Sequence, residues 1–182
     1  MCAASDARGV NILLTEVANK RIVVDEKAAT AKIDAGIILH DALDYLAQYG
    51  SGWSLAAFPW FTFQTTGGAI ATGSHGSSLS FGSLSNDAQL LALDVVLANG
   101  SLVQISKAAH PDLWPAFQVS VGRLGIITAV TMKLVPNAAM QRRMNHVGLQ
   151  SFLAAMMRVQ DAYIREGEAA PEVRALDGVR HV

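Results

Sequence analysis

The chain is poor in cysteine and in long apolar runs, and each absence excludes a class of protein. Its 182 residues contain one cysteine, Cys2, so they can form neither an internal disulfide framework nor a metal site built from several cysteines. No apolar run approaches the roughly 20 residues that a membrane-spanning helix needs. The first nine residues, MCAASDARG, lack the apolar core of a secretory signal. We therefore expect no transmembrane segment in this chain.

Charged residues are also scarce, at 16 % of the chain, and the formal net charge is −1. Domains that bind nucleic acid usually carry a clustered basic face, and the nearest candidate here is the short run at 141–143, QRR. The sequence also lacks the G-x-S-x-G, G-x-x-x-x-G-K-[ST] and H-E-x-x-H motifs and a strand-bounded G-x-G-x-x-G. We expect no nucleic-acid partner and no metal site. The missing motifs also disfavour a hydrolase, an NTPase and a Rossmann-type dinucleotide-binding protein.

Glycine and hydroxyl side chains, by contrast, are concentrated in residues 64–78, QTTGGAIATGSHGSS. Glycine has no Cβ, so the backbone of such a segment can approach a ligand closely. The hydroxyls and His75 add hydrogen-bond donors, and this combination suits an anionic ligand such as a phosphate or pyrophosphate. An aromatic group precedes the segment and is expected to be core: Trp53, Phe58, Trp60, Phe61 and Phe63.

Hydrophobic periodicity predicts strands and helices that are interleaved along the chain. We expect short strands at 11–14, 21–24 and 30–35. A helix is expected at 38–48, where apolar residues recur at the i, i+3, i+4, i+7 spacing. Gly50 is then a plausible helix stop.

The second half of the chain is expected to contain a hairpin, a short helix, a long strand and a final helix. Strands at 90–97 and 102–105 flank Asn99-Gly100, which is a typical hairpin turn. A helix at 111–119, a strand at 122–134 and a helix at 149–164 follow. Because hairpins dominate, the fold class is expected to be α+β with an antiparallel or mixed sheet, and not a doubly wound parallel sheet.

Several pieces of sequence, in a fixed order, carry a resemblance to a known family. They are AGIIL at 35–39 with the helix after it, TTGGAIATGSHGS at 65–77, ANG at 98–100, and DLWPA at 112–116 with GRLGII at 122–127. The set resembles the FAD-binding domain of the vanillyl-alcohol oxidase / p-cresol methylhydroxylase (PCMH) flavoproteins. It is most similar to their sugar-lactone oxidase branch, which includes L-gulonolactone and D-arabinono-lactone oxidases.

The resemblance covers residues 20–136 and implies FAD as the cofactor. In the family the glycine-rich segment lines the flavin and its pyrophosphate, and the backbone at Ile126 would contact the adenine end. Carried over residue by residue, the expected FAD contacts are Thr65, Gly68, Ile70, Gly73, Ser74, His75, Gly76, Ser77, Gly125 and Ile126. The resemblance assigns no catalytic residue to this chain.

The resemblance also implies an activity, which is oxidation of a CH–OH group of a sugar lactone or polyol with flavin as hydride acceptor and O2 as oxidant. Residues 1–136 are expected to be a partial PCMH-type FAD-binding domain, and residues 137–182 a linker and the start of a substrate (cap) domain. The family's earlier Gly-His-Ser type loop, which often carries the histidine bonded to flavin, would lie just before this sequence.

Two alternatives stay open at this point. One is a non-catalytic flavin-binding remnant or module that lacks a complete active site. The other is a different substrate branch of the same superfamily, such as a cytokinin-type dehydrogenase or an enolpyruvyl reductase. Among single residues, His75 is expected to contact ligand without catalysing, Arg123 to be solvated, Asp94 to lie at a strand edge and Asp112 to cap a helix.

Overall fold

The computed structural model describes residues 12–16, 18–78, 81–139, 146–171 and 173. Its main sheet has five strands in the order β1-β2-β6-β4-β5, and each neighbouring pair is antiparallel. The strands are β1 (Ile22–Asp25), β2 (Thr30–Asp34), β4 (Leu90–Val96), β5 (Leu102–Ser106) and β6 (Ile126–Lys133). The predicted α+β class with an antiparallel sheet is confirmed.

Tight turns join the sequential strands of this sheet. Between β4 and β5 the Asn99-Gly100 turn forms as predicted, with Gly100 at a φ of 80°. The Leu97 N–H donates to the Ser101 carbonyl oxygen at 2.9 Å and closes the turn. A positive φ at this place is the reason that the hairpin needs glycine.

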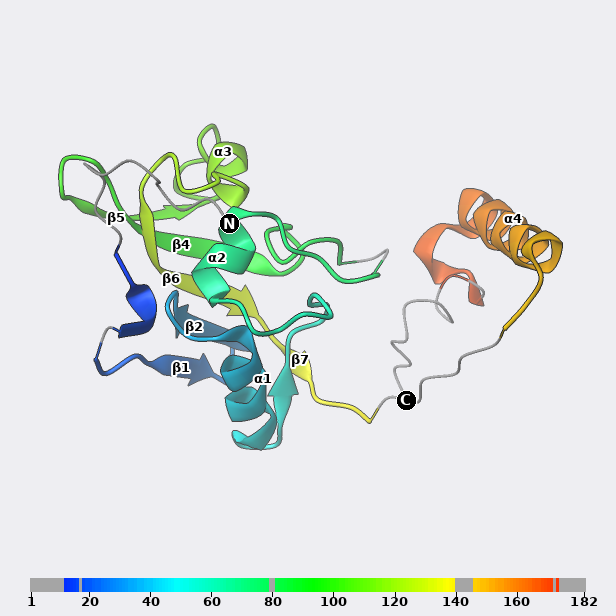
Figure 1. Ribbon diagram of the computed structural model, residues 1–182, viewed down its shortest axis with the longest axis horizontal. Coiled ribbons are helices and arrows are strands. Elements are labelled where there is room, and N and C mark those ends of the chain that lie inside the picture. Colours follow the sequence, from blue (N-terminus) through cyan, green and yellow to red (C-terminus); the bar gives the residue numbers. More distant parts are fainter. Residues whose placement is uncertain (1–11, 17, 79–80, 140–145, 172, 174–182) are drawn as a thin grey trace.

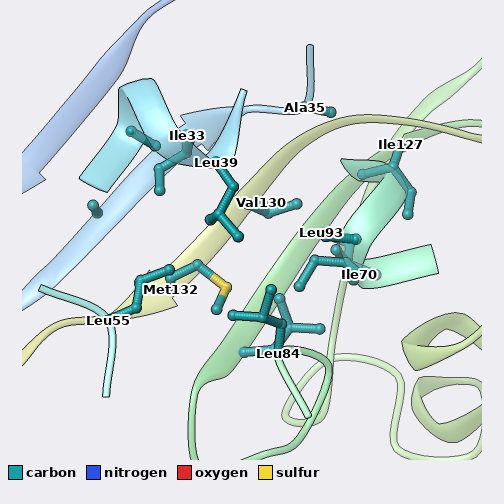
Figure 2. Close-up of a cluster of buried hydrophobic side chains, with 14 of the residues drawn as sticks. Ile33, Ala35, Leu39, Leu55, Ile70, Leu84, Leu93, Ile127, Val130 and Met132 are labelled. Carbon is teal, nitrogen blue, oxygen red and sulfur yellow. The ribbon is translucent and has the colours of Figure 1, made fainter. Parts of the chain in front are cut away.

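Two helices cover one face of the sheet, in front of it in Figure 1. They are α1 (Leu39–Gln48) and α2 (Thr66–Ala71). The buried side of α1 consists of Leu39, Ala42 and Leu46, which repeat at the predicted helical spacing. These residues and Ile70 of α2 join the side chains that the sheet sends to the same face (Figure 2). Each fully buried Leu or Ile contributes about 1.5–3 kcal/mol.

The centre of this core lies on β6. Val130 of β6 stands opposite Ile33 of β2 on one side and Leu93 of β4 on the other. All three side chains have no exposed surface. On the opposite face of the sheet, the Lys32 ammonium forms an ion pair with the Asp94 carboxylate. The alternation of apolar and charged residues along β2 therefore fixes which face receives the helices.

The remaining elements are short or lie apart from the sheet. They are the 3₁₀ helices η1 (Leu14–Glu16) and η2 (Gly167–Ala169), strands β3 (Trp53–Ser54) and β7 (Val135–Pro136), and helices α3 (Trp114–Gln118) and α4 (Leu149–Glu166). Figure 1 shows α4 and η2 together, away from the sheet. Ala162 of α4 forms a small buried cluster with Ala170 and Val173, which follow η2 in the chain. Within the described ranges, no helix is long and apolar enough to cross a membrane.

Two local predictions are wrong. Residues 12–14 of the expected strand at 11–14 do not form a strand, because Leu14 begins η1 and packs against the core at the position left open by Gly36; residue 11 lies outside the described part. Asp112 does not cap a helix, because α3 begins one residue later than a cap at 112 would require. Leu113 is the N-cap, and its side chain makes no cap hydrogen bond.

The aromatic group before the glycine-rich segment is not core as predicted. Trp60 is 91 % exposed, Phe61 58 % and Phe63 64 %, and Phe58 is also exposed. Trp53 alone packs partly buried against the core cluster. Exposed aromatic surface of this extent is unusual on a folded domain and often marks a place where something binds.

Candidate cofactor site

The glycine-rich segment is fixed at its start by the turn between β2 and α1. The Leu39 N–H donates to the Gln64 carbonyl oxygen at 2.9 Å. Both the N–H and the hydroxyl of Thr66 donate to the Ile37 carbonyl oxygen, at 2.8 and 2.9 Å. The Gly67 N–H donates to the Ala35 carbonyl oxygen at 2.9 Å. The AGI sequence at 35–37 therefore supplies the acceptors that hold the segment in place.

Part of the segment is helical, since Thr66–Ala71 form α2. Thr65 caps the helix, because its Oγ1 accepts a hydrogen bond from the Gly68 N–H at 3.3 Å. The backbone N–H groups of residues 66–69 and 72–74 all donate to protein oxygens. They are therefore unavailable to a ligand in this conformation, and donors for one must come from side chains and from residues 75–77.

The glycines of the segment serve two different purposes. A Cβ at Gly67 would lie 2.6 Å from the Ala35 Cβ, and a Cβ at Gly76 would overlap the carbonyl oxygen of Phe58. These two glycines let the backbone approach other parts of the protein. Gly68 is exposed, and a Cβ there would meet the Thr65 Oγ1 at 2.9 Å and otherwise face outward. Gly68 therefore opens the outer edge of α2 to close approach by a ligand.

The loop at 119–125 lies beside the end of α2 and brings the second group of predicted residues to the segment. The Val121 N–H donates to the Ala71 carbonyl oxygen at 2.9 Å. Gly73, with a φ of 66°, ends the helix against Val119. Gly125 packs closely on β4, since a Cβ there would lie 2.6 Å from a Val95 methyl group. It is followed by Ile126, an exposed residue at the start of β6.

Hydroxyl groups line the exposed edge between these two regions. The Thr72 hydroxyl donates to the Gly68 carbonyl oxygen at 2.9 Å and lies 3.4 Å from the Ser74 hydroxyl. The Ser74 hydroxyl donates to Gln64 Oε1 at 3.1 Å. Ser77 is exposed. These hydroxyls can be donors to a phosphate, because a hydroxyl hydrogen can rotate toward a new acceptor.

The stretch after α2 adds a backbone donor. In the part of the chain that the structure describes, the Ser77 N–H has no backbone hydrogen-bond partner, whereas Gly76 lies beside the short antiparallel bridge between His75 and Ser83. His75 is exposed, and its Nδ1 lies 3.0 Å from the Gly76 carbonyl oxygen. Free N–H groups next to hydroxyls fit the oxygens of a diphosphate. The residues present are therefore compatible with FAD along the edge from Gly68 to Ser77.

Ile70 does not belong to this surface. Its side chain has no exposed area and lies in the core next to Leu93 and Leu84 (Figure 2). Ile70 lies two positions after the exposed Gly68, which places its side chain about 200° around the helix and on the inward-facing side. The predicted FAD contact from Ile70 is therefore not supported by its position.

A polar hollow of about 330 Å³ lies beside the site, and the sequence analysis missed it. It adjoins the glycine-rich segment, because the Leu84 N–H donates to the Ser74 carbonyl oxygen and Val119 packs on Gly73. Its lining is Ser83, Ser85, Asn86, Asp87, Pro115, Gln118 and Val119. The polar residues Ser83, Ser85 and Asn86, which follow His75 in the sequence, could have indicated a polar surface here.

Asp87 organises one wall of this hollow. Its carboxylate accepts hydrogen bonds from Lys107 Nζ at 2.6 Å, Trp114 Nε1 at 2.6 Å and Gln118 Nε2 at 2.7 Å. The bond from Lys107 is the largest cause, and that from Trp114 the next, of a pKa for Asp87 below its ordinary value. A carboxylate here disfavours a second anion, so the hollow itself is a poor place for phosphate. Among the described residues, no three His, Cys, Asp or Glu side chains form a group able to hold a metal ion.

Known proteins resemble this chain in sequence and in fold. Residues 2–106 match the family described as FAD binding domain. L-gulonolactone oxidase of Bos taurus is 27 % identical over 150 residues, which are 82 % of this chain and 32 % of that protein. D-arabinono-1,4-lactone oxidase of Saccharomyces cerevisiae is 33 % identical over 108 residues, which are 59 % of this chain and 20 % of that protein.

The crystal structure of 6-hydroxy-D-nicotine oxidase from Arthrobacter nicotinovorans has a similar fold, with a TM-score of 0.58 and 20 % sequence identity. The likeness covers 83 % of this chain and 32 % of that one. The chain thus spans about a fifth to a third of the length of the relatives that it matches. Because the family match covers more than half of the chain, FAD is confirmed as the predicted cofactor, and the chain belongs to the FAD binding domain family.

Proposed function

We propose that this chain is part of an FAD-dependent oxidoreductase that oxidises a CH–OH group of a sugar lactone or polyol, with O2 as the oxidant. The observation that carries the proposal is the family match over residues 2–106, joined to relatives named L-gulonolactone oxidase and D-arabinono-1,4-lactone oxidase. FAD, when bound, supplies the hydride acceptor, and the protein supplies binding and orientation.

The proposed cofactor surface runs along the outer edge of α2 and onto the loops on either side. Gly68 would let the ligand approach, Ser74 and Ser77 would donate hydroxyl hydrogen bonds, and the Ser77 N–H would donate from the backbone. The nine residues that we assign to FAD contact are Thr65, Gly68, Gly73, Ser74, His75, Gly76, Ser77, Gly125 and Ile126.

Two units are proposed within the chain. Residues 1–136 would be a partial FAD-binding domain, and residues 137–182 a linker and the start of a second, substrate-binding domain. The buried cluster that Ala162 of α4 forms with Ala170 and Val173, separate from the sheet core, supports this division. Limited proteolysis tests it, since cleavage should occur first between residues 137 and 148, whereas first cleavage inside the sheet would contradict it.

The visible absorption spectrum of the purified chain tests the function. FAD is added, excess is removed by gel filtration, and the protein fraction is scanned. Flavin bands that stay with the protein, followed by lactone-dependent O2 consumption, are the expected result. A colourless protein fraction after reconstitution, with no affinity for FAD in equilibrium titration, would contradict the proposal.

The second candidate function is flavin binding without catalysis. It is favoured by one observation. Among the nine residues assigned to FAD contact, His75 is the single side chain of a type that commonly acts as a general acid or base, and its Nδ1 lies 3.0 Å from the Gly76 carbonyl oxygen. Retained flavin bands together with no turnover of L-gulono- or D-arabinono-lactones would favour this second function.

A further inference from the structure

The segment at 58–63, which we call the aromatic arm, presents three large rings to solvent. Trp60, Phe61 and Phe63 have most of their surface exposed, although aromatic side chains gain strongly from burial. A fourth ring joins them from α1, because His40 stacks on Phe63 with centroids 4.9 Å apart and planes 30° apart. The centroids of Phe61 and Phe63 lie 6.1 Å apart. The rings of His40, Phe63 and Phe61 therefore form a continuous aromatic surface, and the exposed Trp60 directly precedes Phe61 in the chain.

The backbone of the arm is held in place, so the rings are presented by a defined scaffold. The His40 N–H donates to the Thr62 carbonyl oxygen at 3.0 Å. Gln64 Nε2 donates to the Phe61 carbonyl oxygen at 3.0 Å. At the other end, Gly76 packs directly on the Phe58 carbonyl oxygen. A surface fixed at both ends loses little conformational entropy when a flat ligand stacks on it.

The arm is continuous with the proposed FAD surface. Gln64, whose amide nitrogen binds the arm, accepts a hydrogen bond from the Ser74 hydroxyl through its Oε1 at 3.1 Å. Thr65, the cap of α2, follows at once in the chain. One end of the FAD surface therefore offers hydroxyls and N–H groups, and the other end offers aromatic rings.

We propose that the aromatic arm is the platform on which the isoalloxazine ring of FAD stacks, with Phe61 and Phe63 as positioning residues and His40 supporting Phe63. This inference rests on the proposed FAD site. FAD has one end that needs hydrogen-bond donors and another that is a broad, flat heteroaromatic ring. Stacking of such rings on aromatic side chains is favourable and does not require one exact orientation. The protein surface likewise changes from hydrogen-bond donors at one end to aromatic rings at the other.

Titration of the full chain with FAD, riboflavin and ADP tests the proposal. Riboflavin carries the ring without the diphosphate and ADP carries the diphosphate without the ring, so each probe reports one end of the surface. We expect riboflavin to bind and to quench the emission of Trp60, which the Trp60→Phe variant identifies among the three tryptophans. Phe61→Ser and Phe63→Ser should each weaken FAD and riboflavin about fivefold or more, and leave ADP affinity unchanged.

A matched control is Phe152→Ser, which removes an exposed phenylalanine from α4, away from the arm. It should change none of the three affinities. Since Phe61 and Phe63 are exposed, their variants should fold, and unchanged thermal unfolding verifies this.

Two results would overturn the proposal while leaving the proposed function intact. One is equal loss of FAD and ADP affinity in the arm variants. The other is unchanged flavin affinity together with a changed oligomeric state, which would make the arm a protein-docking surface. A wild-type chain that binds neither FAD nor ADP would instead overturn the proposed function, and this inference with it.

Discussion

A glycine in a cofactor site can allow close packing inside the protein or close approach by the ligand. Replacing Gly68 with alanine tests which of the two applies to Gly68. Gly68 is exposed in α2, and its added Cβ would meet the Thr65 Oγ1 at 2.9 Å and otherwise point outward. The Gly68→Ala variant should therefore fold. Its methyl group would stand on the outer edge of the helix, one turn before Thr72, where we propose that FAD lies.

The expected effect on stability is close to zero. Alanine is favoured over glycine inside a helix by about 0.5–1 kcal/mol. Disturbing the hydrogen bond from the Gly68 N–H to the Thr65 hydroxyl costs about 1 kcal/mol. Flavin binding should change much more, because a ligand held away from Thr72 and Ser74 loses at least one charge-assisted hydrogen bond, worth about 1.5–3 kcal/mol. The dissociation constant for FAD should therefore rise about tenfold to a hundredfold.

Flavin fluorescence titration and thermal unfolding of the same preparations measure the two effects. The matched control is Gly148→Ala, at the cap of α4, where a Cβ meets nothing within 4 Å. This control should leave FAD affinity unchanged and shift stability by a few tenths of a kcal/mol. Unchanged FAD affinity in Gly68→Ala, with unfolding also unchanged, would refute the assignment of the α2 edge to the cofactor.

Three further predictions concern stability and association. Gly76→Ala should destabilise the fold by about 1–3 kcal/mol in urea unfolding, because its Cβ has no room against the arm backbone; a loss below 0.5 kcal/mol measured against Gly148→Ala would contradict this. The hydrogen bond from Lys107 lowers the pKa of Asp87, so the Asp87 network stabilises the protein above pH about 4 and is lost as the pH falls through the lowered pKa. Urea unfolding at pH 7, 5 and 3 should show wild-type stability falling more steeply than that of Asp87→Asn below pH 4, and parallel curves would argue against the network. The exposed apolar face of α4 should cause self-association that the double replacement Leu153→Glu with Met157→Glu reduces in sedimentation velocity; a wild-type chain that is monomeric at all concentrations tested would count against it.

Much of the sheet could be predicted because its signals are local. The helical spacing at 38–48 corresponds to Leu39–Gln48 in the structure, and the expected strand at 90–97 corresponds to Leu90–Val96. The Asn99-Gly100 turn forces a positive φ that few other residues tolerate. In each case a pattern within ten residues carries the information, so no knowledge of the rest of the fold is needed.

The aromatic arm could not be predicted in the same way. The sequence FPWFTF at 58–63 has no helical or strand period, and the rings alone favour burial. Their exposure follows from the long-range contacts of the backbone, with His40 bonded to Thr62 on one side and Gly76 packed on Phe58 on the other. Composition reports that a side chain is apolar, but only the path of the chain decides whether anything covers it.

The glycines of the cofactor segment also show that long-range contacts decide the role of a residue, here within a single motif. In the sequence Gly67, Gly68 and Gly76 look alike, and the family resemblance assigns an FAD contact to Gly68 and Gly76. In the structure Gly67 approaches Ala35, Gly76 approaches Phe58, and Gly68 alone of the three is exposed on the outer edge. Replacing Gly68 alone should therefore keep this fold and weaken FAD binding. Replacing Gly67 or Gly76 should instead destabilise the fold, so weaker FAD binding in a chain that still folds distinguishes Gly68 from the two glycines that pack inside the protein.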